Sequence, residues 1–146
     1  MSVEQILQAK GRSVATVRAS ATVEEAVRRM AGPPRIGALV VCRDAERRLV
    51  GMLTERDVVA GLGTEGPGLL RRTVEEVMSR NVPTCSPGDS VTQLMAQMTR
   101  RRYRHVPVVV DGQLVGLVSI GDVVNHRLRE MELETGVLRD LYHAAR

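Results

Sequence analysis

The sequence predicts a mixed fold of the α+β (α/β) class, in which two β-α-β-β-α repeats pack sheet to sheet with pseudo-two-fold symmetry and a C-terminal helix follows. Three observations support this prediction. The segments LVGMLTERDVV at 49–59 and LVGLVSIGDVV at 114–124 agree at six of eleven positions. In each copy, a segment with apolar residues at helical spacing is followed by short runs of β-branched residues, and this order is the same in both copies. One copy is too small to bury both faces of its sheet, whereas two copies can do so together.

The composition is that of a basic globular protein with almost no aromatic residues. Of its 146 residues, 43% are hydrophobic and 26% are charged, which suits one compact domain or two small ones that share a core. All of the 21 basic residues except Lys10 are arginines, which suit phosphate binding, and the formal net charge is +4. Two Tyr, no Trp and no Phe leave no stacking platform for single-stranded nucleic acid, so a nucleic-acid-binding protein is only an alternative.

The sequence favours neither a membrane segment nor a metal site. The longest apolar runs, 36–42 and 106–110, are far shorter than the roughly 20 residues of a transmembrane helix. The first residues lack the features of a signal peptide, so we expect a cytoplasmic protein without membrane contact. Cys42 and Cys85 are isolated, which favours two buried thiols, with a disulfide as the alternative. The three histidines are too far apart in sequence to predict a metal site.

Each repeat is predicted to begin with a similar leading segment and to continue with an amphipathic helix. Residues 3–7 resemble residues 74–78, so the repeats start near positions 3 and 74. Apolar residues at i, i+3, i+4 and i+7 predict helices over 23–30 and 91–98. Four glycines and one proline within 61–68 predict a linker. We therefore expect one domain over 1–66, a second over 67–128 and an amphipathic C-terminal helix over 129–146.

Local motifs mark where the amphipathic helices begin and end. Gly32-Pro33-Pro34 ends the first of them. Both helices begin with a predicted capping box, in which a hydroxyl and the side chain three residues on satisfy two free N–H groups. These boxes are Thr22-x-x-Glu25 and Ser90-x-x-Gln93.

Two strands and a second helix follow in each copy. The β-branched runs that predict the strands lie at 36–42, 49–53, 106–110 and 114–118. Asp111-Gly112 predicts a two-residue hairpin turn in the second copy, whereas a longer charged loop, 43–48, joins the strands of the first. The second helix of each repeat is expected to start at Thr54 or at Ser119.

One motif could carry chemistry, because it occurs where each strand meets its helix. A helix N-terminus attracts phosphate, a hydroxyl can donate to a phosphate oxygen, and a carboxylate three residues on can bind a ribose diol. The same pattern is also a plain N-cap, and a duplication copies caps as faithfully as it copies sites. The motif is Gly-x-x-Thr/Ser-x-x-Asp, formed by Gly51, Thr54 and Asp57 and by Gly116, Ser119 and Asp122.

With its tandem repeat, this motif and an Arg-x-x-x-φ-Val-Val strand at 35–41 and 104–110, the chain resembles a pair of CBS domains, the Bateman module. The resemblance covers residues 3 to about 128. It implies a stand-alone ligand sensor that binds an adenine nucleotide between its repeats. AMP is the expected ligand, with ADP or ATP next and NAD(H) or S-adenosylmethionine as alternatives. It also implies a homodimer of four CBS domains and an unidentified regulated protein.

The resemblance also assigns ligand contacts. The phosphate-contacting hydroxyls are matched by Thr54 and Ser119, and the ribose-binding carboxylates by Asp57 and Asp122. The leading strand that lines the adenine pocket is matched by Thr16, Val17, Thr84 and Cys85. The strand that faces it is matched by Ile36, Gly37, Ala38, His105, Val106 and Pro107. Basic side chains in reach of phosphate are Arg35, Arg104 and His105, whereas Arg100–Arg102 also fit a solvated helix end.

Catalysis is not expected, because the sequence has no nucleophile–base pair, metal cluster or Walker-type loop. The tail is predicted to be a helix over 126–146 with a heptad stripe. That stripe consists of Leu128, Met131, Thr135, Leu138, Tyr142 and Ala145. Two interpretations stay open: a helix folded onto its own module, and a contact with a second copy or a partner. A membrane-surface helix is disfavoured, because acidic residues offset its arginines.

Overall fold

The computed structural model describes residues 1–43, 45 and 47–145. Asp44 and Glu46 of the predicted charged loop, and Arg146 of the predicted tail, lie outside the described residues. The elements are α1 (Val3–Lys10), β1 (Thr16–Arg18), α2 (Val23–Ala31), β2 (Ala38–Arg43), β3 (Arg48–Thr54), α3 (Glu55–Glu65), the 3-10 helix η2 (Gly66–Arg71), α4 (Val74–Val77), α5 (Val91–Arg101), β4 (His105–Val110), β5 (Gln113–Ser119) and α6 (Ile120–Ala144).

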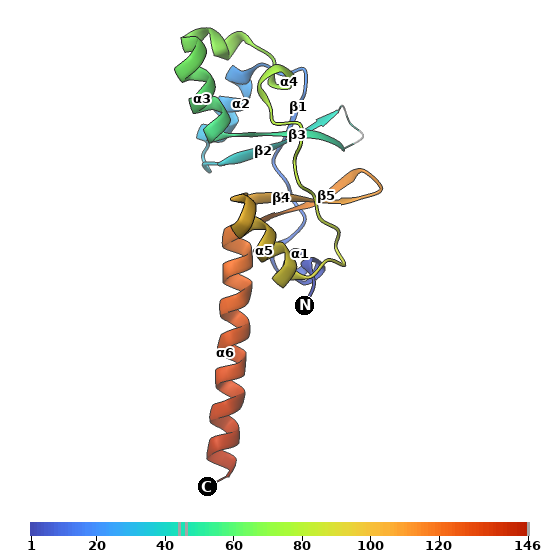
Figure 1. Cartoon of the computed structure of the whole chain (residues 1–146), viewed down its shortest axis with the longest axis vertical. Coiled ribbons are helices and arrows are strands. Elements are labelled where there is room, and N and C mark those ends of the chain that lie inside the picture. Colours follow the sequence, from blue (N-terminus) through green and yellow to red (C-terminus); the bar gives the residue numbers. More distant parts are fainter. Residues whose placement is uncertain (44, 46, 146) are drawn as a thin grey trace.

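The strands form two antiparallel hairpins that meet edge to edge at one point. The strand order is β1-β2-β3-β5-β4, and the hairpins β2–β3 and β4–β5 are joined by the single pair Arg48 and Gln113. In Figure 1 the two hairpins lie one above the other, with helices α2, α3 and α4 beyond the first and α1 and α5 beyond the second. The predicted class, a mixed fold of two similar repeats with a C-terminal helix, is confirmed.

Alternate residues of β2 supply two different cores. Leu39 and Val41 pack with the helices of the first repeat. Val40 and Cys42 pack in a separate cluster with Leu114 of β5, between the two hairpins. Since successive side chains of a strand point to opposite faces, β2 is buried on both. This explains why its sequence is continuously apolar and not alternating.

The leading helices are exchanged between the repeats. Helix α1 packs in the core of the second repeat with Val91 and Leu94, and the N–H of Val3 donates to the carbonyl of Asp89 at 2.9 Å. Helix α4 packs in the core of the first repeat, where the N–H of Val74 donates to the carbonyl of Ala21 at 2.8 Å. Each repeat therefore completes its core with a helix that precedes the other repeat in sequence.

Local motifs are confirmed in part. Asp111 and Gly112 have φ values of 52° and 77°, as the predicted two-residue hairpin turn requires. Helix α2 ends before Gly32, as predicted. The hydroxyls of Thr22 and Ser90 accept the N–H groups three residues on, which is one of the two bonds of a capping box.

Two parts of the repeat differ from the prediction. The glycine-rich segment 61–68 is not a linker but part of α3 and η2, and it packs closely, because a Cβ on Gly61 would lie 2.7 Å from Leu69. The leading strand of the second copy is reduced to one parallel bridge, between Cys85 and Val108. The residue types of each segment can be read from the sequence, but the residues against which the segment packs cannot.

Helix α6 unites the second helix of repeat 2 and the predicted tail in 25 residues. Its N-terminal part packs on the second repeat through Val123, which is fully buried. Every described residue from Met131 onward is exposed, and the helix projects away from the body in Figure 1. The prediction that the tail folds onto its own module is therefore wrong for this part. No helix within the described ranges is long and apolar enough to cross a membrane.

Candidate functional site

The repeated motif forms two similar strand–helix junctions, which we call the first junction (Gly51 to Asp57) and the second junction (Gly116 to Asp122). In the first, the N–H of Thr54 donates to Asp57 Oδ2 at 2.9 Å, and the N–H of Asp57 donates to Thr54 Oγ1 at 3.2 Å. In the second, Ser119 and Asp122 form the same two bonds at 2.9 and 3.1 Å. Both junctions are thus complete capping boxes, and the capping role of these residues is confirmed.

The motif glycines make room for the exchanged helices. A Cβ on Gly51 would lie 2.6 Å from the carbonyl oxygen of Ser79, just after α4. A Cβ on Gly116 would lie 2.6 Å from the side chain of Leu7 in α1. Since real Cβ atoms do not approach other atoms so closely, each glycine permits a leading helix to cross the strand. The glycine of the motif is thus explained by packing.

Strand register shows which residues are equivalent at the two junctions. Ala38 pairs with Thr54, and His105 pairs with Ser119, so His105 occupies the place of Ala38. The carbonyls of Gly37 and Arg104 accept equivalent N–H groups, at 3.1 and 2.8 Å, from the first residue of α3 and of α6. The alignment of 35–41 with 104–110 is therefore wrong by two residues. A shift of two preserves which face each side chain occupies, so the apolar pattern could not reveal it.

The second junction contains a lysine that was not predicted to be there. Lys10, the last residue of α1, donates from Nζ to Asp122 Oδ2 at 2.5 Å and to the carbonyl of Leu117 at 2.9 Å. Burial works to raise the pKa of Asp122. The hydrogen bonds from Lys10 and from Ser119 outweigh burial and hold this pKa below its usual range. Both residues bond to Oδ2 of the carboxylate.

His105 makes the second junction a cluster of basic groups. Burial lowers the pKa of this histidine; Asp122 opposes that effect, and the charges of Lys10 and Arg104 reinforce it. His105 is therefore neutral near pH 7 and can accept or donate a hydrogen bond. Arg104 is exposed beside it. The predicted residues Arg104, His105, Ser119 and Asp122 thus lie together.

In the first junction, no described residue takes the place of Lys10 or His105 as a basic group. Gly37 and Ala38 stand where the second junction has arginine and histidine. The Asp57 carboxylate is bonded at both oxygens, since Oδ1 accepts the hydroxyl of Ser79 at 3.3 Å. Arg35 pairs with Glu55, a residue of the first junction, at 2.9 and 3.1 Å on the exposed surface, and its expected contact with phosphate stays a prediction.

Two hollows of very different size lie beside predicted site residues of the two repeats. Thr16 and Val17 line a hollow of about 520 Å³, which is in the range of small-molecule sites. Arg29 lines it too and donates to the carbonyl of Thr16. The hollow beside Lys10 and Asp122 measures about 70 Å³, enough for water alone.

Both cysteines are buried free thiols, as the isolated positions favoured. Burial raises the pKa of Cys42, and it raises the pKa of Cys85 to about 12. Neither is therefore a thiolate near neutral pH, and the predicted role of Cys85 is an apolar wall. Across the part of the chain that the structure describes, no group of three His, Cys, Asp or Glu residues could hold a metal ion.

Three residues near the candidate sites were missed by sequence reasoning: Lys10, Ser79 and Arg29. Lys10 is the last residue of α1 and Ser79 follows α4, and each reaches the motif carboxylate of the repeat on which that helix packs. The sequence signal that could have drawn attention to Lys10 is its status as the only lysine. Nothing local marked Ser79, because its contact depends on the exchange of helices.

Comparison with known proteins agrees with the fold and the repeat. A mitochondrial CBS domain-containing protein of Arabidopsis thaliana, CBSX3, is 32% identical over 136 residues, which are 88% of this chain and 66% of that protein. A crystal structure of a CBS-domain containing protein from Agrobacterium tumefaciens is 40% identical with a TM-score of 0.79, covering 86% of this chain and 92% of that one. The CBS domain pair of protein MJ0100 is 26% identical with a TM-score of 0.75, covering 89% and 98%. The CBS domain family itself matches at residues 3–63 and 74–129, and the chain therefore belongs to that family and carries the domain twice.

Proposed function

We propose that this chain is a regulatory CBS pair that binds an adenine nucleotide, AMP first and ADP or ATP next, and catalyses no reaction. The observation that carries the proposal is the second junction, where Lys10 bonds to the carboxylate of Asp122 and His105 lies within the electrostatic influence of Lys10, Arg104 and Asp122. Such a group suits a ligand that has both a ribose diol and a phosphate. The family match indicates no enzyme family.

The capping bonds are compatible with this function. Asp122 uses Oδ2 for both of its bonds, so we assign Oδ1 to a ribose hydroxyl. Ser119 Oγ accepts the N–H of Asp122 and keeps its own hydroxyl proton for a phosphate oxygen. We assign the adenine to an aliphatic wall that needs no aromatic residue. The residues assigned to it are Thr84, Cys85, Val106 and Pro107, of which Thr84 is exposed, whereas Cys85 and Val106 are buried in the second core behind it.

We propose the equivalent residues of the first repeat as a second, weaker cleft. Its carboxylate, on Asp57, already accepts the hydroxyl of Ser79 at Oδ1, so a ribose hydroxyl would have to share that oxygen. The 520 Å³ hollow beside Thr16, which Arg18 and Arg29 also line, supports a ligand on this side, while Gly37 and Ala38 stand in place of Arg104 and His105 and so weaken phosphate binding. The remaining residues assigned to this cleft are Val17, Ile36 and Thr54.

Related structures support an adenosyl ligand. The CBS pair of protein MJ0100 was solved with 5′-methylthioadenosine and S-adenosyl-L-methionine. CBSX2, which shares this fold, was solved with AMP. All three ligands contain the adenine and ribose that the assigned residues would bind, and of the three only AMP carries a phosphate.

Regulation requires that the ligand bind two arrangements of the chain with different affinity. Lys10 supplies the coupling we propose, because it belongs to α1 and bonds to the carboxylate assigned to ribose. Ligand binding would change that bond, and with it the packing of an exchanged helix. We propose a homodimer and a regulated protein as partners and a reducing, cytoplasmic location, and we keep the domain limits 1–66, 67–128 and 129–146.

The test is to titrate the purified chain with AMP, ADP, ATP, NAD and S-adenosylmethionine. Thermal shift measures the stabilisation of the fold, and calorimetry measures the affinity. We expect AMP to stabilise the fold and Asp122→Asn, which keeps a capping oxygen, to weaken binding about tenfold. The matched variant Asp57→Asn should change binding about threefold or less. Absence of stabilisation by every adenylate at millimolar concentration would refute the proposal. Tighter binding of S-adenosylmethionine than of AMP would overturn the choice of a nucleotide.

A further inference from the structure

Helix α6 presents two different faces as it leaves the second repeat. Val123 is fully buried, and the side chains of His126 and Glu130 are only 18% and 14% exposed. On the opposite side, Val124 is 48% exposed and Leu128 is 54% exposed. The side of α6 that faces away from the second repeat is therefore apolar and exposed at Val124 and Leu128.

We propose that this face pairs with α6 of a second copy in a parallel, two-stranded coiled coil. With Leu128 at position a, the apolar positions recur every three and four residues to the end of the helix. Position a holds Leu128, Thr135 and Tyr142, and position d holds Val124, Met131, Leu138 and Ala145. Met131 and Leu138 are 54% and 66% exposed in the single chain.

The charges beside the seam favour a second copy of this chain in the parallel orientation. Arg127 and Glu134 occupy g positions, and Glu132 and Arg139 occupy e positions. In a parallel pair, each g residue meets the e residue five positions on in the other strand. Arg127 then faces Glu132, and Glu134 faces Arg139, so each pair occurs twice with opposite charges. Arg127 also donates to Glu130 of its own helix at 3.1 Å, and this bond competes with a contact to Glu132 of the other copy. The Glu134–Arg139 pair is therefore better suited to an experiment.

An antiparallel pair with the same seam has poorer complementarity. When Thr135 packs against Leu138 of the other copy, Glu132 faces Arg139, but Glu134 faces the apolar Leu141. Antiparallel strands match g with g and e with e, so half of the favourable contacts are lost. The charge pattern therefore distinguishes the two orientations and selects the parallel one.

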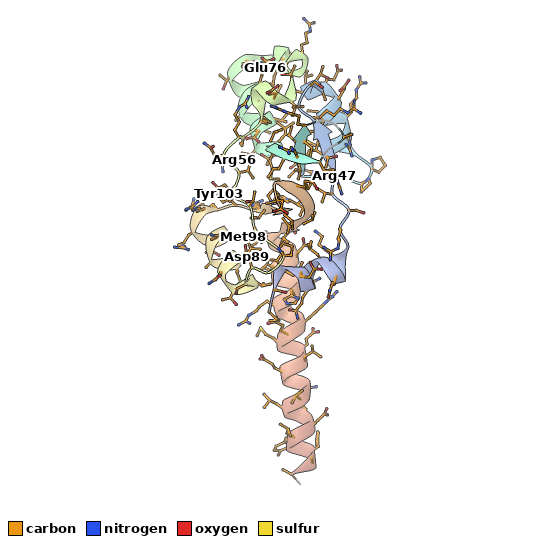
Figure 2. All side chains as sticks on the ribbon, turned by 90° about the vertical axis from the view of Figure 1, so that its right-hand side faces the viewer. Arg47, Arg56, Glu76, Asp89, Met98 and Tyr103 are labelled. Carbon is orange, nitrogen blue, oxygen red and sulfur yellow. The ribbon has the colours of Figure 1, made fainter. Side chains whose placement is uncertain are left out.

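The module does not obstruct this pairing. The covered residues, Val123 and Glu130, share heptad position c, which lies on the far side of the helix from a and d. In a parallel dimer the two modules would lie at the same end, each outside the seam. Figures 1 and 2, viewed at right angles, both show the lower part of α6 extending beyond the rest of the chain. Leu133 at position f and Val137 at position c lie off the seam and provide an internal control.

Cross-linking of the full chain tests the proposal. Leu138→Cys places a thiol at d, where equivalent residues of parallel strands face each other, whereas Val137→Cys places one at c, outside the seam. The native Cys42 and Cys85 do not compete, because burial raises the pKa of both. Under mild oxidation we expect covalent dimers of Leu138→Cys to form at least about tenfold faster than those of Val137→Cys. Equal rates, or a faster reaction of Val137→Cys, would overturn the proposed seam.

A charge exchange tests the orientation. In the Leu138→Cys background, Arg139→Glu places a second carboxylate opposite Glu134 in a parallel pair, and we expect about tenfold slower cross-linking at low salt. Adding Glu134→Arg restores opposite charges and should return the rate to within about twofold of the parent. An antiparallel pair would keep the repulsion between Glu132 and the new carboxylate in both variants, so lack of rescue would overturn the parallel arrangement. Neither substitution touches the candidate ligand site.

Discussion

The two strand–helix junctions share a backbone and differ in charge. Both have a glycine crossed by an exchanged helix, a complete capping box and a carboxylate reached by a residue from that helix's end. The second adds Lys10, Arg104 and His105, whereas the first has Ser79, Gly37 and Ala38 in or near the corresponding places. The shared features are therefore those that stabilise the fold. The features that can discriminate a ligand differ between the copies: the second has Lys10 and His105 at its junction, and the first has the larger hollow beside Thr16.

This difference separates two roles that one motif suggested together. A glycine, a hydroxyl and a carboxylate at fixed spacing are sufficient for the cap and for the passage of a leading helix. Ligand preference must come from residues outside the motif, because the motif itself is the same in both copies. Substitutions at equivalent positions of the two junctions can therefore test which residues stabilise the fold and which could bind a ligand.

The largest expected effect comes from filling the space of the motif glycines. At Gly51 a new Cβ meets the backbone carbonyl of Ser79, so we expect Gly51→Ala to lower the free energy of unfolding by about 3 kcal/mol. At Gly116 the new Cβ meets the end of the Leu7 side chain, which can shift, and we expect a loss of about 1 kcal/mol. Urea unfolding monitored by circular dichroism measures both.

The control for this pair is Gly63→Ala, because a Cβ at Gly63 in α3 meets nothing within 4 Å. Alanine favours a helix interior, so this variant should gain up to about 1 kcal/mol. Equal losses at Gly51 and Gly116 would contradict the difference we draw between a rigid backbone neighbour and a flexible side chain.

A smaller effect is expected from the residues that reach the two carboxylates. Lys10→Met removes an ion pair whose side chains are only 33% and 22% exposed, and we expect it to cost about 1 kcal/mol in the free energy of unfolding. Ser79→Ala removes a longer hydrogen bond of 3.3 Å at Asp57 and should cost about 0.5 kcal/mol. Thermal unfolding at low and high salt separates them, since salt should weaken only the lysine contact. A salt-independent loss in Lys10→Met would argue against an electrostatic role.

The smallest expected effect is a pH dependence that belongs to the second junction alone. Burial lowers the folded-state pKa of His105, so its neutral form is favoured in the folded chain. Its contribution to stability is complete above the unfolded value of 6.5 and is lost as the pH falls through the folded value. The lowered pKa of Asp122 acts in the same direction, but only below its ordinary value of 3.8.

His105→Ala tests this assignment, because it installs the residue that the first junction has at Ala38. We expect the variant to lose less stability than the parent protein between pH 7.5 and pH 5.5, as followed by urea titration. An unchanged difference between the two pH values would mean that another group titrates in this range.

Much of the fold could be predicted from the sequence, because its signals are local. The hairpin turn at Asp111-Gly112, the helix ends at Gly32 and the caps at Thr54 and Ser119 each depend on a few neighbouring residues. An apolar stripe, by contrast, shows that a helix is covered but not by which core. The sequence therefore could not predict the exchange of α1 and α4 or the packing of segment 61–68 against Leu69.

The candidate site was predictable to a similar extent. The motif located both junctions, and the arginine-rich second copy indicated that they differ. The two-residue error in aligning 35–41 with 104–110 concealed that Arg104 corresponds to Gly37. The contact of Lys10 with Asp122 spans 112 positions, and no periodicity connects residues so far apart.

The exchanged leading helices also bear on how the chain is made. During synthesis α1 emerges first, yet its core partners, Val91 and Leu94, follow only after the whole first repeat. The first repeat must likewise wait for α4, which emerges after α3. Contacts of such long sequence separation slow folding, because a large loop closes before they form. The first repeat can therefore complete its core only after α4 has been made, and we expect a half-length nascent chain to expose the apolar face of α1 until the second repeat is complete.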